Sequence, residues 1–500
     1  MSYVDEMSCF GASVAVSGRL LYTTDPGDAA SITKSTNDRG RVYVFKCNKE
    51  GKRGRLMSVI SSPTIPDFDD AFGCSIAVDK KFTADICNDR VIIGACRGVS
   101  SKGVSGLAYV FETTDGGESY TLVNTLNPDC LPKIVKVDCL DSSDNAINVL
   151  PEGSDAQHRM WFGWAVDIYS TGSFGDEYYA MVGAYGSNTS CVWSSGKVYM
   201  YKLSDMGNSV LILSNTYDGP KLNEFFGYSV ALGCKMSATG ESQVYAAIGA
   251  FGSNTQGAVY IVDNVGIQFD NDSGNSCDAT CLERLGCGCT YGYALDAYCG
   301  YLVVGAPYME CTGSAFVYNM DTFSPSAGSE CASCMLRLRN QTNIWHFGRA
   351  VSIYGNFIVI GTNSPEGGLA LVFEKGYSKH ALDEFQCLKE LNDNYWRLEA
   401  TLRSYADDEI GFAYSVAVGN CYILVGSPVV QQSNLYTLRV TRKHYCDRAT
   451  PYLTFDPKYF DAYIPQLCEI TNIKYNEYPG SEDKLALVLY HPSLPPKCGC

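Results

Sequence analysis

Short runs of apolar residues recur along most of the chain, always in the same order. A Phe-Gly or Tyr-Gly pair opens a run of alternating apolar and small residues, as in FGYSVAL at 226–232. A second run ends in Gly-Ala or a close variant, as in AIGA at 247–250, and a third follows a glycine, as in VYIV at 259–262. The runs are short, rich in β-branched and aromatic residues, and bounded by turn-forming residues, which predicts strands rather than helices.

The opening element occurs seven times, at Phe10, Phe72, Phe162, Phe226, Tyr291, Phe347 and Phe412, and in the last copy Ala413 replaces the glycine. A fourth, weaker run often precedes the next copy, as at residues 120–126. A unit of four short strands cannot bury its own faces and must pack against its neighbours. Seven such units match the number of four-stranded blades found in β-propellers. The predicted fold class is therefore all-β, a seven-bladed β-propeller of four-stranded blades with a short C-terminal extension.

The order Phe-Gly, then Gly-Ala-Pro (305–307), then a strand such as AYVF (108–111) resembles the FG-GAP repeat. Over about residues 8–440 the chain is similar to the N-terminal seven-bladed propeller of integrin α subunits. The resemblance implies a surface or extracellular recognition role, with partners bound by loops on one face. Calcium-binding copies of that family carry an Asp-rich hairpin between the first two strands. The corresponding turns here lack closely spaced oxygen ligands, so we expect no calcium hairpins and no cofactor.

The repeat divides the chain into a propeller at residues 1–440 and an extension at 441–500 that contains Cys, Pro and Tyr. Long gaps in the pattern predict insertions at about 128–160, 264–290 and 376–396, the last with the pattern of a short amphipathic helix. The seventh unit lacks a fourth strand at the normal spacing. Either the extension, which has a predicted strand at 485–490, or residues 2–4 would supply it and close the ring.

The net charge and the lengths of the apolar runs exclude some classes of partner and bear on where the protein is located. The formal net charge is −16 and no basic patch occurs, which argues against nucleic acid and anionic membrane surfaces. No apolar run approaches ~18 residues, so we expect no transmembrane segment. The resemblance predicts an extracellular, cell-surface or particle-surface location. The first residues show no secretory signal, which leaves synthesis in the cytoplasm as the alternative.

The 23 cysteines leave several alternatives open. The densest group lies within thirteen residues and consists of Cys277, Cys281, Cys287 and Cys289. Four thiolates can complete a zinc shell, but this spacing matches no standard zinc motif, so disulfides or free thiols are favoured over a metal site. Cys130 and Cys139 are a candidate disulfide that would close the first insertion.

Candidate contact residues come from the longest loops between second and third strands. Aromatic and arginine side chains dominate interface hot spots, which selects Arg97, Tyr185 and Trp193 for binding a partner. Three asparagines lie in Asn-x-Ser/Thr triplets and are candidate glycosylation sites on a secretory route: Asn188, Asn271 and Asn340.

No short catalytic motif is present, neither a nucleophile elbow nor a metalloprotease helix nor a phosphate-binding loop. The chain is therefore predicted not to be an enzyme. The favoured function is a binding or adhesion module that recognises a protein or glycan partner. The alternative is a structural subunit of a large assembly, such as a virus particle or a cell-surface lattice. An enzyme with a site at the mouth of the central channel is the third hypothesis.

Overall fold

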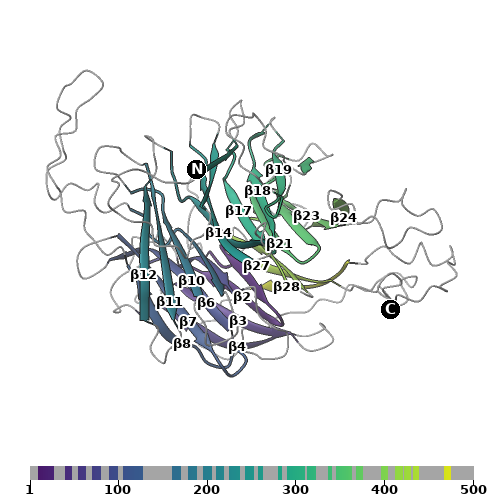
Figure 1. Ribbon diagram of the computed structural model, residues 1–500. Helices are drawn as coiled ribbons and strands as arrows, with labels where there is room; N and C mark the ends of the chain where they lie inside the picture. The colour runs from purple at the N-terminus through teal and green to yellow at the C-terminus, as the bar shows by residue number, and fades with distance from the viewer. Residues whose placement is uncertain are drawn as a thin grey trace, which may run out of the picture.

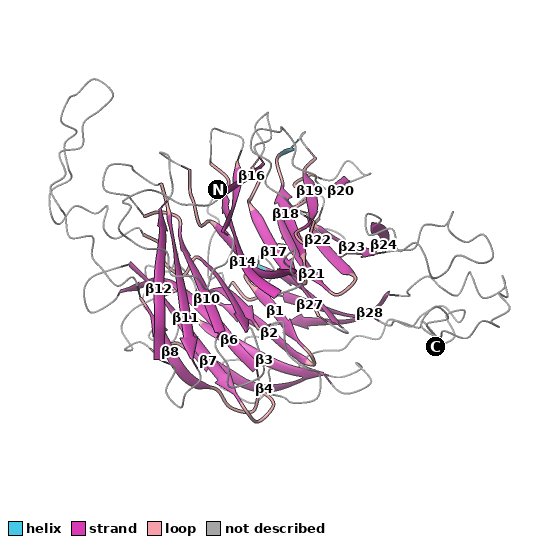
Figure 2. Cartoon of the chain, in the orientation of Figure 1, coloured by secondary structure: helices cyan, strands magenta, loops and turns pink. Residues whose placement is uncertain are grey.

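The computed structural model shows an all-β architecture (Figure 1, Figure 2). It describes residues 9–27, 40–47, 54–63, 70–79, 89–99, 105–127, 160–170, 178–187, 195–204, 210–218, 224–236, 242–252, 257–262, 280–283, 290–309, 312–322, 336–339, 345–362, 367–375, 396–403, 411–419, 422–428, 432–438 and 467–474. Within these residues 28 strands form seven four-stranded antiparallel sheets, and no α-helix occurs. The same residues contain no helix with the length and apolar character needed to cross a membrane.

The first four sheets follow one another in sequence. Sheet 1 contains β1 (Val14–Ser17), β2 (Leu20–Asp25), β3 (Arg41–Cys47) and β4 (Gly54–Ser61). Sheet 2 contains β5 (Phe72–Val78), β6 (Asp89–Val99), β7 (Ser105–Thr113) and β8 (Thr121–Leu126). Sheet 3 contains β9 (Ala165–Ser170), β10 (Tyr178–Ala184), β11 (Lys197–Ser204) and β12 (Val210–Asp218). Sheet 4 contains β13 (Ser229–Met236), β14 (Ser242–Ala250), β15 (Ala258–Val262) and β16 (Thr280–Glu283).

The remaining three sheets repeat the same plan. Sheet 5 contains β17 (Ala294–Tyr298), β18 (Tyr301–Ala306), β19 (Ser314–Asn319) and β20 (Leu336–Arg339). Sheet 6 contains β21 (Ala350–Tyr354), β22 (Phe357–Gly361), β23 (Leu369–Lys375) and β24 (Trp396–Arg403). Sheet 7 contains β25 (Ser415–Val418), β26 (Tyr422–Ser427), β27 (Gln432–Leu438) and β28 (Leu467–Lys474).

The sheets follow one another around an axis, with their first strands innermost. Each first strand contacts the first strand of the next sheet, and β25 contacts β1. The described core divides into seven apolar clusters, and each cluster combines residues of two neighbouring sheets. One of them joins Leu424 and Leu435 of sheet 7 to Phe10 and Tyr43 of sheet 1. Because every sheet buries both faces against neighbours, the architecture is propeller-like.

Polar contacts also join the last sheet to the first. The hydroxyl of Ser415 donates to the carbonyl oxygen of Gly11 at 2.8 Å, and the hydroxyls of Thr23 and Ser433 lie 2.7 Å apart. Sheet 7 takes its fourth strand, β28, from residues that follow 440, and β28 pairs with β27. The other candidates for that strand, at 2–4 and 485–490, and the helix predicted within 376–396 lie outside the described residues.

Two glycines in five of the seven repeats, and one in each of the other two, allow neighbouring sheets to interlock. The glycine of the Phe-Gly pair adopts a φ between 83° and 94° in the six copies that have it, which favours glycine. The glycine of the second strand packs on that turn in the next sheet. A Cβ at Gly183 would lie 2.1 Å from the carbonyl oxygen of Gly227, and one at Gly426 would lie 2.1 Å from that of Gly11. The repeated glycines thus mark contacts between sheets.

Ala413 occupies the left-handed turn position that glycine fills in the other six repeats. Its φ is 61°, a conformation that costs a residue with a Cβ about 1–2 kcal/mol. We expect Ala413→Gly to raise the free energy of unfolding by about 1 kcal/mol, measured by urea denaturation. Ala413→Val should lower it, and equal stability of the three proteins would contradict the assigned turn.

Asp89 lies in a buried polar cluster between sheets 1 and 2. It is 5% exposed and accepts hydrogen bonds from the Ser17 hydroxyl at 2.8 Å and the Tyr22 hydroxyl at 2.6 Å. Burial raises the pKa of Asp89 to about 6, because desolvation outweighs the two hydrogen bonds that favour the carboxylate. The folded protein therefore binds this proton more tightly than the unfolded chain does.

The raised pKa predicts a dependence of stability on pH. The contribution from protonated Asp89 is complete below pH ~4 and is lost as the pH rises through about 6. Asp89→Asn should remove this loss, which amounts to about 2–3 kcal/mol between pH 4 and pH 7. Urea unfolding of both proteins across this range measures the difference, with the exposed Glu118→Gln as control. Parallel curves for wild type and Asp89→Asn would refute the assignment.

Candidate functional site

A cavity of about 660 Å³ lies on the axis of the ring, where the first strands of the sheets meet. Every one of the seven first strands contributes to its wall. The lining repeats in layers, because equivalent positions of the repeat lie at equivalent depths. The second residue after Phe-Gly is Ser or Ala, as at Ser13, Ser75 and Ser415, and the third is Val, Ile or Leu.

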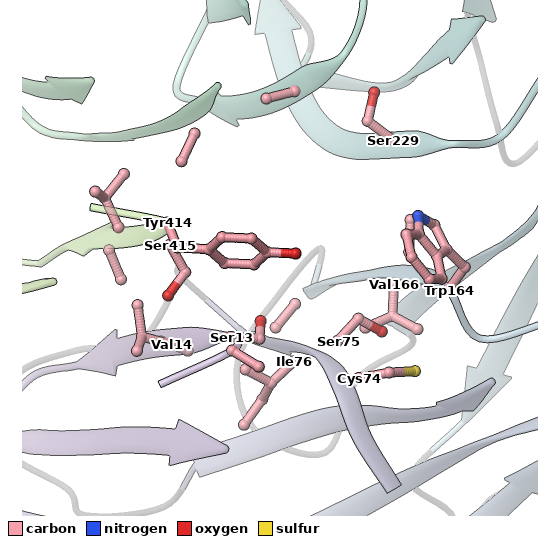
Figure 3. Close-up of a pocket in the computed structure, with 18 of the residues that line it drawn as sticks. Ser13, Val14, Cys74, Ser75, Ile76, Trp164, Val166, Ser229, Tyr414 and Ser415 are labelled. Atoms are coloured by element: carbon pink, nitrogen blue, oxygen red, sulfur yellow. The ribbon is translucent and has the colours of Figure 1, made fainter. Parts of the chain in front are cut away.

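The mouth of the cavity is formed by the residue directly after each Phe-Gly pair. All seven of these residues line the cavity: Ala12, Cys74, Trp164, Tyr228, Tyr293, Arg349 and Tyr414. The Phe or Tyr two positions earlier is fully buried between sheets in every copy. The turn then directs the following side chain toward the axis. In Figure 3, Tyr414 reaches into the cavity from one side, and Trp164 and Cys74 lie on the other.

Four of the seven mouth positions are large aromatic residues, here called the aromatic rim: Trp164, Tyr228, Tyr293 and Tyr414. Three of them form a continuous row, with ring centroids 5.6 Å apart for Trp164 and Tyr228 and 5.1 Å for Tyr228 and Tyr293. The hydroxyl of Tyr228 donates to that of Tyr293 at 3.2 Å. Tyr414 stands 41% exposed. The rim therefore offers flat apolar surfaces beside hydroxyl groups that can form hydrogen bonds.

Burial and the neighbouring Tyr293 raise the pKa of the Tyr228 phenol well above its ordinary value. This phenol is therefore neutral at physiological pH. Its single hydrogen is donated to Tyr293, so the Tyr228 oxygen can accept a hydrogen bond from a ligand hydroxyl group, while the Tyr293 hydroxyl keeps its own hydrogen to donate.

Residues with left-handed backbone precede several of the Phe-Gly pairs. The residue before Phe-Gly has a positive φ at Trp161 (56°), Phe225 (55°) and His346 (61°). Left-handed backbone is costly for bulky residues, and such strain clusters at functional sites. Trp161 lines the cavity, and Phe225 stacks on Phe251 with centroids 5.2 Å apart. The left-handed turn thus places one large aromatic side chain, Trp161, in the cavity wall.

Positive charge reaches the mouth from two sheets. Arg97 lies in β6, the second strand of sheet 2, and its guanidinium carbon lies 5.8 Å from the Trp161 ring centroid. Arg349 is the mouth residue of sheet 6, and its guanidinium carbon lies 4.4 Å from the Tyr414 ring centroid. Both line the cavity. Aromatic faces attract such cations, and the contact holds each guanidinium in place.

Two carboxylates line the cavity at greater depth, and both bind backbone. Asp167 accepts from its own neighbour Ile168 at 2.8 Å and from Leu232 of the next sheet at 2.6 Å. Asp296 does the same with Ala297 at 2.9 Å and Ile353 at 2.8 Å. These residues fasten neighbouring first strands to each other.

Two of the three predicted contact residues lie near this site. Arg97 lines the cavity, and the Tyr185 ring lies 5.1 Å from Trp164 and 5.3 Å from Tyr228 between centroids. Trp193 lies outside the described residues. The aromatic rim itself was missed. The available signal was the residue after Phe-Gly, which varies among Trp, Tyr, Arg, Cys and Ala while its neighbours repeat.

The other candidate sites lie largely beyond the described part of the chain. The backbone of Cys281 is described in β16, whereas Cys277, Cys287, Cys289, Cys130 and Cys139 are outside it. The three asparagines proposed for glycosylation, Asn188, Asn271 and Asn340, are outside it too. Within the described ranges no group of three or more His, Cys, Asp or Glu side chains is placed to hold a metal ion.

The sequence matches no protein-family model and no curated protein. Two solved structures align with most of the chain at 10% identity. One, described as a "putative 6-phosphogluconolactonase" from Bacteroides fragilis, has a TM-score of 0.44 and covers 91% of this chain and 95% of its own. The other is a mutant Aleuria aurantia lectin in complex with α-methyl-L-fucoside, with a TM-score of 0.36 and coverage of 73% and 92%. Neither alignment assigns a site or an activity to this chain.

The prediction that the chain is not an enzyme is contradicted by the first of these structures, because a 6-phosphogluconolactonase is an enzyme. The prediction relied on the absence of short catalytic motifs. In a ring of sheets, side chains that meet at the axis come from separate repeats, so a catalytic group need not form a motif along the chain. Enzymatic activity is therefore no longer excluded, and at this similarity no reaction is assigned.

Proposed function

We propose that the chain is a seven-bladed β-propeller of the FG-GAP type that binds a sugar unit of a glycan at the mouth of its central cavity. The observation that carries the proposal is the aromatic rim. A cavity of about 660 Å³ falls within the range of small-ligand sites. Sugar rings present an apolar face and a border of hydroxyl groups, which matches flat aromatic rings flanked by Tyr and Ser hydroxyls.

The FG-GAP part of the proposal is supported by the role of the repeat. A Phe-Gly or Tyr-Gly pair precedes six of the seven sheets and Phe412-Ala413 precedes the seventh, and where the second strand carries a glycine, that glycine packs on the equivalent pair of the next sheet. The motif therefore performs the same structural task in each unit, as a true repeat does. The same geometry places one variable side chain per sheet at the mouth, which is where recognition can vary without loss of the fold.

Glycan binding is tested by saturation-transfer NMR and calorimetry with a panel of neutral and acidic mono- and disaccharides. We expect the wild-type protein to bind at least one, and Trp164→Ala combined with Tyr228→Ala to lose binding by tenfold or more, as loss of stacked aromatic contacts predicts. Leu122→Ala, an exposed residue of the outer strand β8, is the matched control. Binding of no sugar, or equal binding by the rim variant, would refute the proposal.

A further inference from the structure

The charge of the mouth is opposite to the charge of the chain. The formal net charge is −16, yet the mouth positions include one arginine and no acidic residue. Arg97 adds a second cation to the cavity wall. The two carboxylates of the cavity, Asp167 and Asp296, lie deeper, so the two arginines set the field at the mouth, and that field attracts an anionic group.

Arg349 is the residue that this field depends on. Its guanidinium lies over the Tyr414 ring, with 4.4 Å between the guanidinium carbon and the ring centroid. Among the described residues no carboxylate is in ion-pair contact with Arg349. The acids of the cavity, Asp167 and Asp296, instead accept backbone N–H groups. Arg349 thus presents its donors at the mouth without a carboxylate partner from these residues.

The neighbours of Arg349 around the ring define what else the ligand must offer. The equivalent positions on either side are Tyr293 in sheet 5 and Tyr414 in sheet 7. Guanidinium donors match a carboxylate in a planar two-point contact, and the flanking rings suit an apolar ring face. A ligand that satisfies both carries a carboxylate directly on a sugar ring.

We propose that the mouth binds an acidic sugar, a uronic or sialic acid, whose carboxylate pairs with Arg349 while its ring lies on the aromatic rim. This inference rests on the proposed function and names its ligand class. Arg349 makes the protein bind an acidic sugar more tightly than a neutral one. The aromatic rim contributes to the binding of both kinds of sugar.

The test compares matched probes: methyl β-D-glucuronide against methyl β-D-glucoside, and sialyllactose against lactose. We expect the acidic member of at least one pair to bind about tenfold or more tightly than the neutral one, the scale of a hydrogen bond to a charged group. Arg349→Ala should abolish that preference, so that the acidic and the neutral member of each pair bind this variant with equal affinity. Arg349→Lys should retain part of it, and the preference should weaken as salt is added.

Arg55→Ala, on the exposed edge strand β4, is the matched control and should bind as wild type does. Thermal unfolding of each variant confirms that it is folded. Equal binding of acidic and neutral sugars, or an unchanged preference in Arg349→Ala, would overturn the inference while the proposed function stands. Binding of none of the four probes by folded wild-type protein would overturn the inference, and failure of the wider neutral and acidic panel would overturn the proposed function as well.

Discussion

Gly305→Val should lower the free energy of unfolding by at least about 3 kcal/mol, and the variant should be recovered largely as unfolded or aggregated protein. Gly305 belongs to β18 and pairs with Ala294 and Ala315 on either side. A Cβ at this position would lie 2.0 Å from the carbonyl oxygen of Gly348 in the next sheet. The obstacle is backbone rather than a flexible side chain, so relief requires sheets 5 and 6 to separate.

Gly355→Ala is the control that separates crowding from backbone conformation. Gly355 has a φ of 57°, and a Cβ there would meet no atom within 4 Å, so its cost is conformational and about 1–2 kcal/mol. Gly305→Ala should cost more than this, although its φ lies outside the left-handed region. Urea unfolding measures both. A Gly305→Ala variant as stable as Gly355→Ala would show that sheets 5 and 6 do not interlock at this glycine.

The strand plan could be predicted from the sequence because it depends on local patterns. The alternation after Phe226 and the apolar run before Gly249 each occupy a single strand, and turn residues mark both ends. The partner of Gly249 could not be predicted in this way. It packs on the carbonyl oxygen of Gly292, and that contact depends on how two sheets are placed against each other. Because the repeats are similar in sequence, the sequence does not show whether a given glycine packs within its own sheet or against the next one.

The candidate site was predicted in part for a similar reason. Loop length and residue type selected Arg97 and Tyr185, and both lie beside the aromatic rim. Tyr228 and Tyr293 were not selected, because each follows a Phe-Gly pair and looks like a minor variation of the repeat. Only the ring geometry brings these positions, 65 residues apart, to one cavity mouth with their hydroxyls 3.2 Å apart. Aligning the seven copies by Phe-Gly and comparing the next residue would have revealed them.

Asp296→Ala should lower the free energy of unfolding by about 3 kcal/mol, because two backbone N–H groups would lose their charged acceptor. Its carboxylate accepts the N–H of Ala297 at 2.9 Å and, across the sheet boundary, the N–H of Ile353 at 2.8 Å. Both are hydrogen bonds to a charged group, which are stronger than neutral ones. Ile353 is fully buried, so its N–H would lose its partner in a place that water reaches poorly.

Ser352 occupies the same repeat position in sheet 6 and provides the scale for this prediction. Its hydroxyl accepts the N–H of Val418 in the next sheet at 3.1 Å. This hydrogen bond spans its sheet boundary at the position equivalent to the Asp296 bond to Ile353, but its acceptor is neutral and accepts one N–H group instead of two. Ser352→Ala should therefore cost about 1 kcal/mol. Asp296→Asn, which keeps one carbonyl acceptor, should fall between the two alanine variants. If urea unfolding gave Asp296→Ala and Ser352→Ala the same small loss, the carboxylate would not be fastening strand β17 to strand β21, and the packing of apolar residues alone would hold these sheets together.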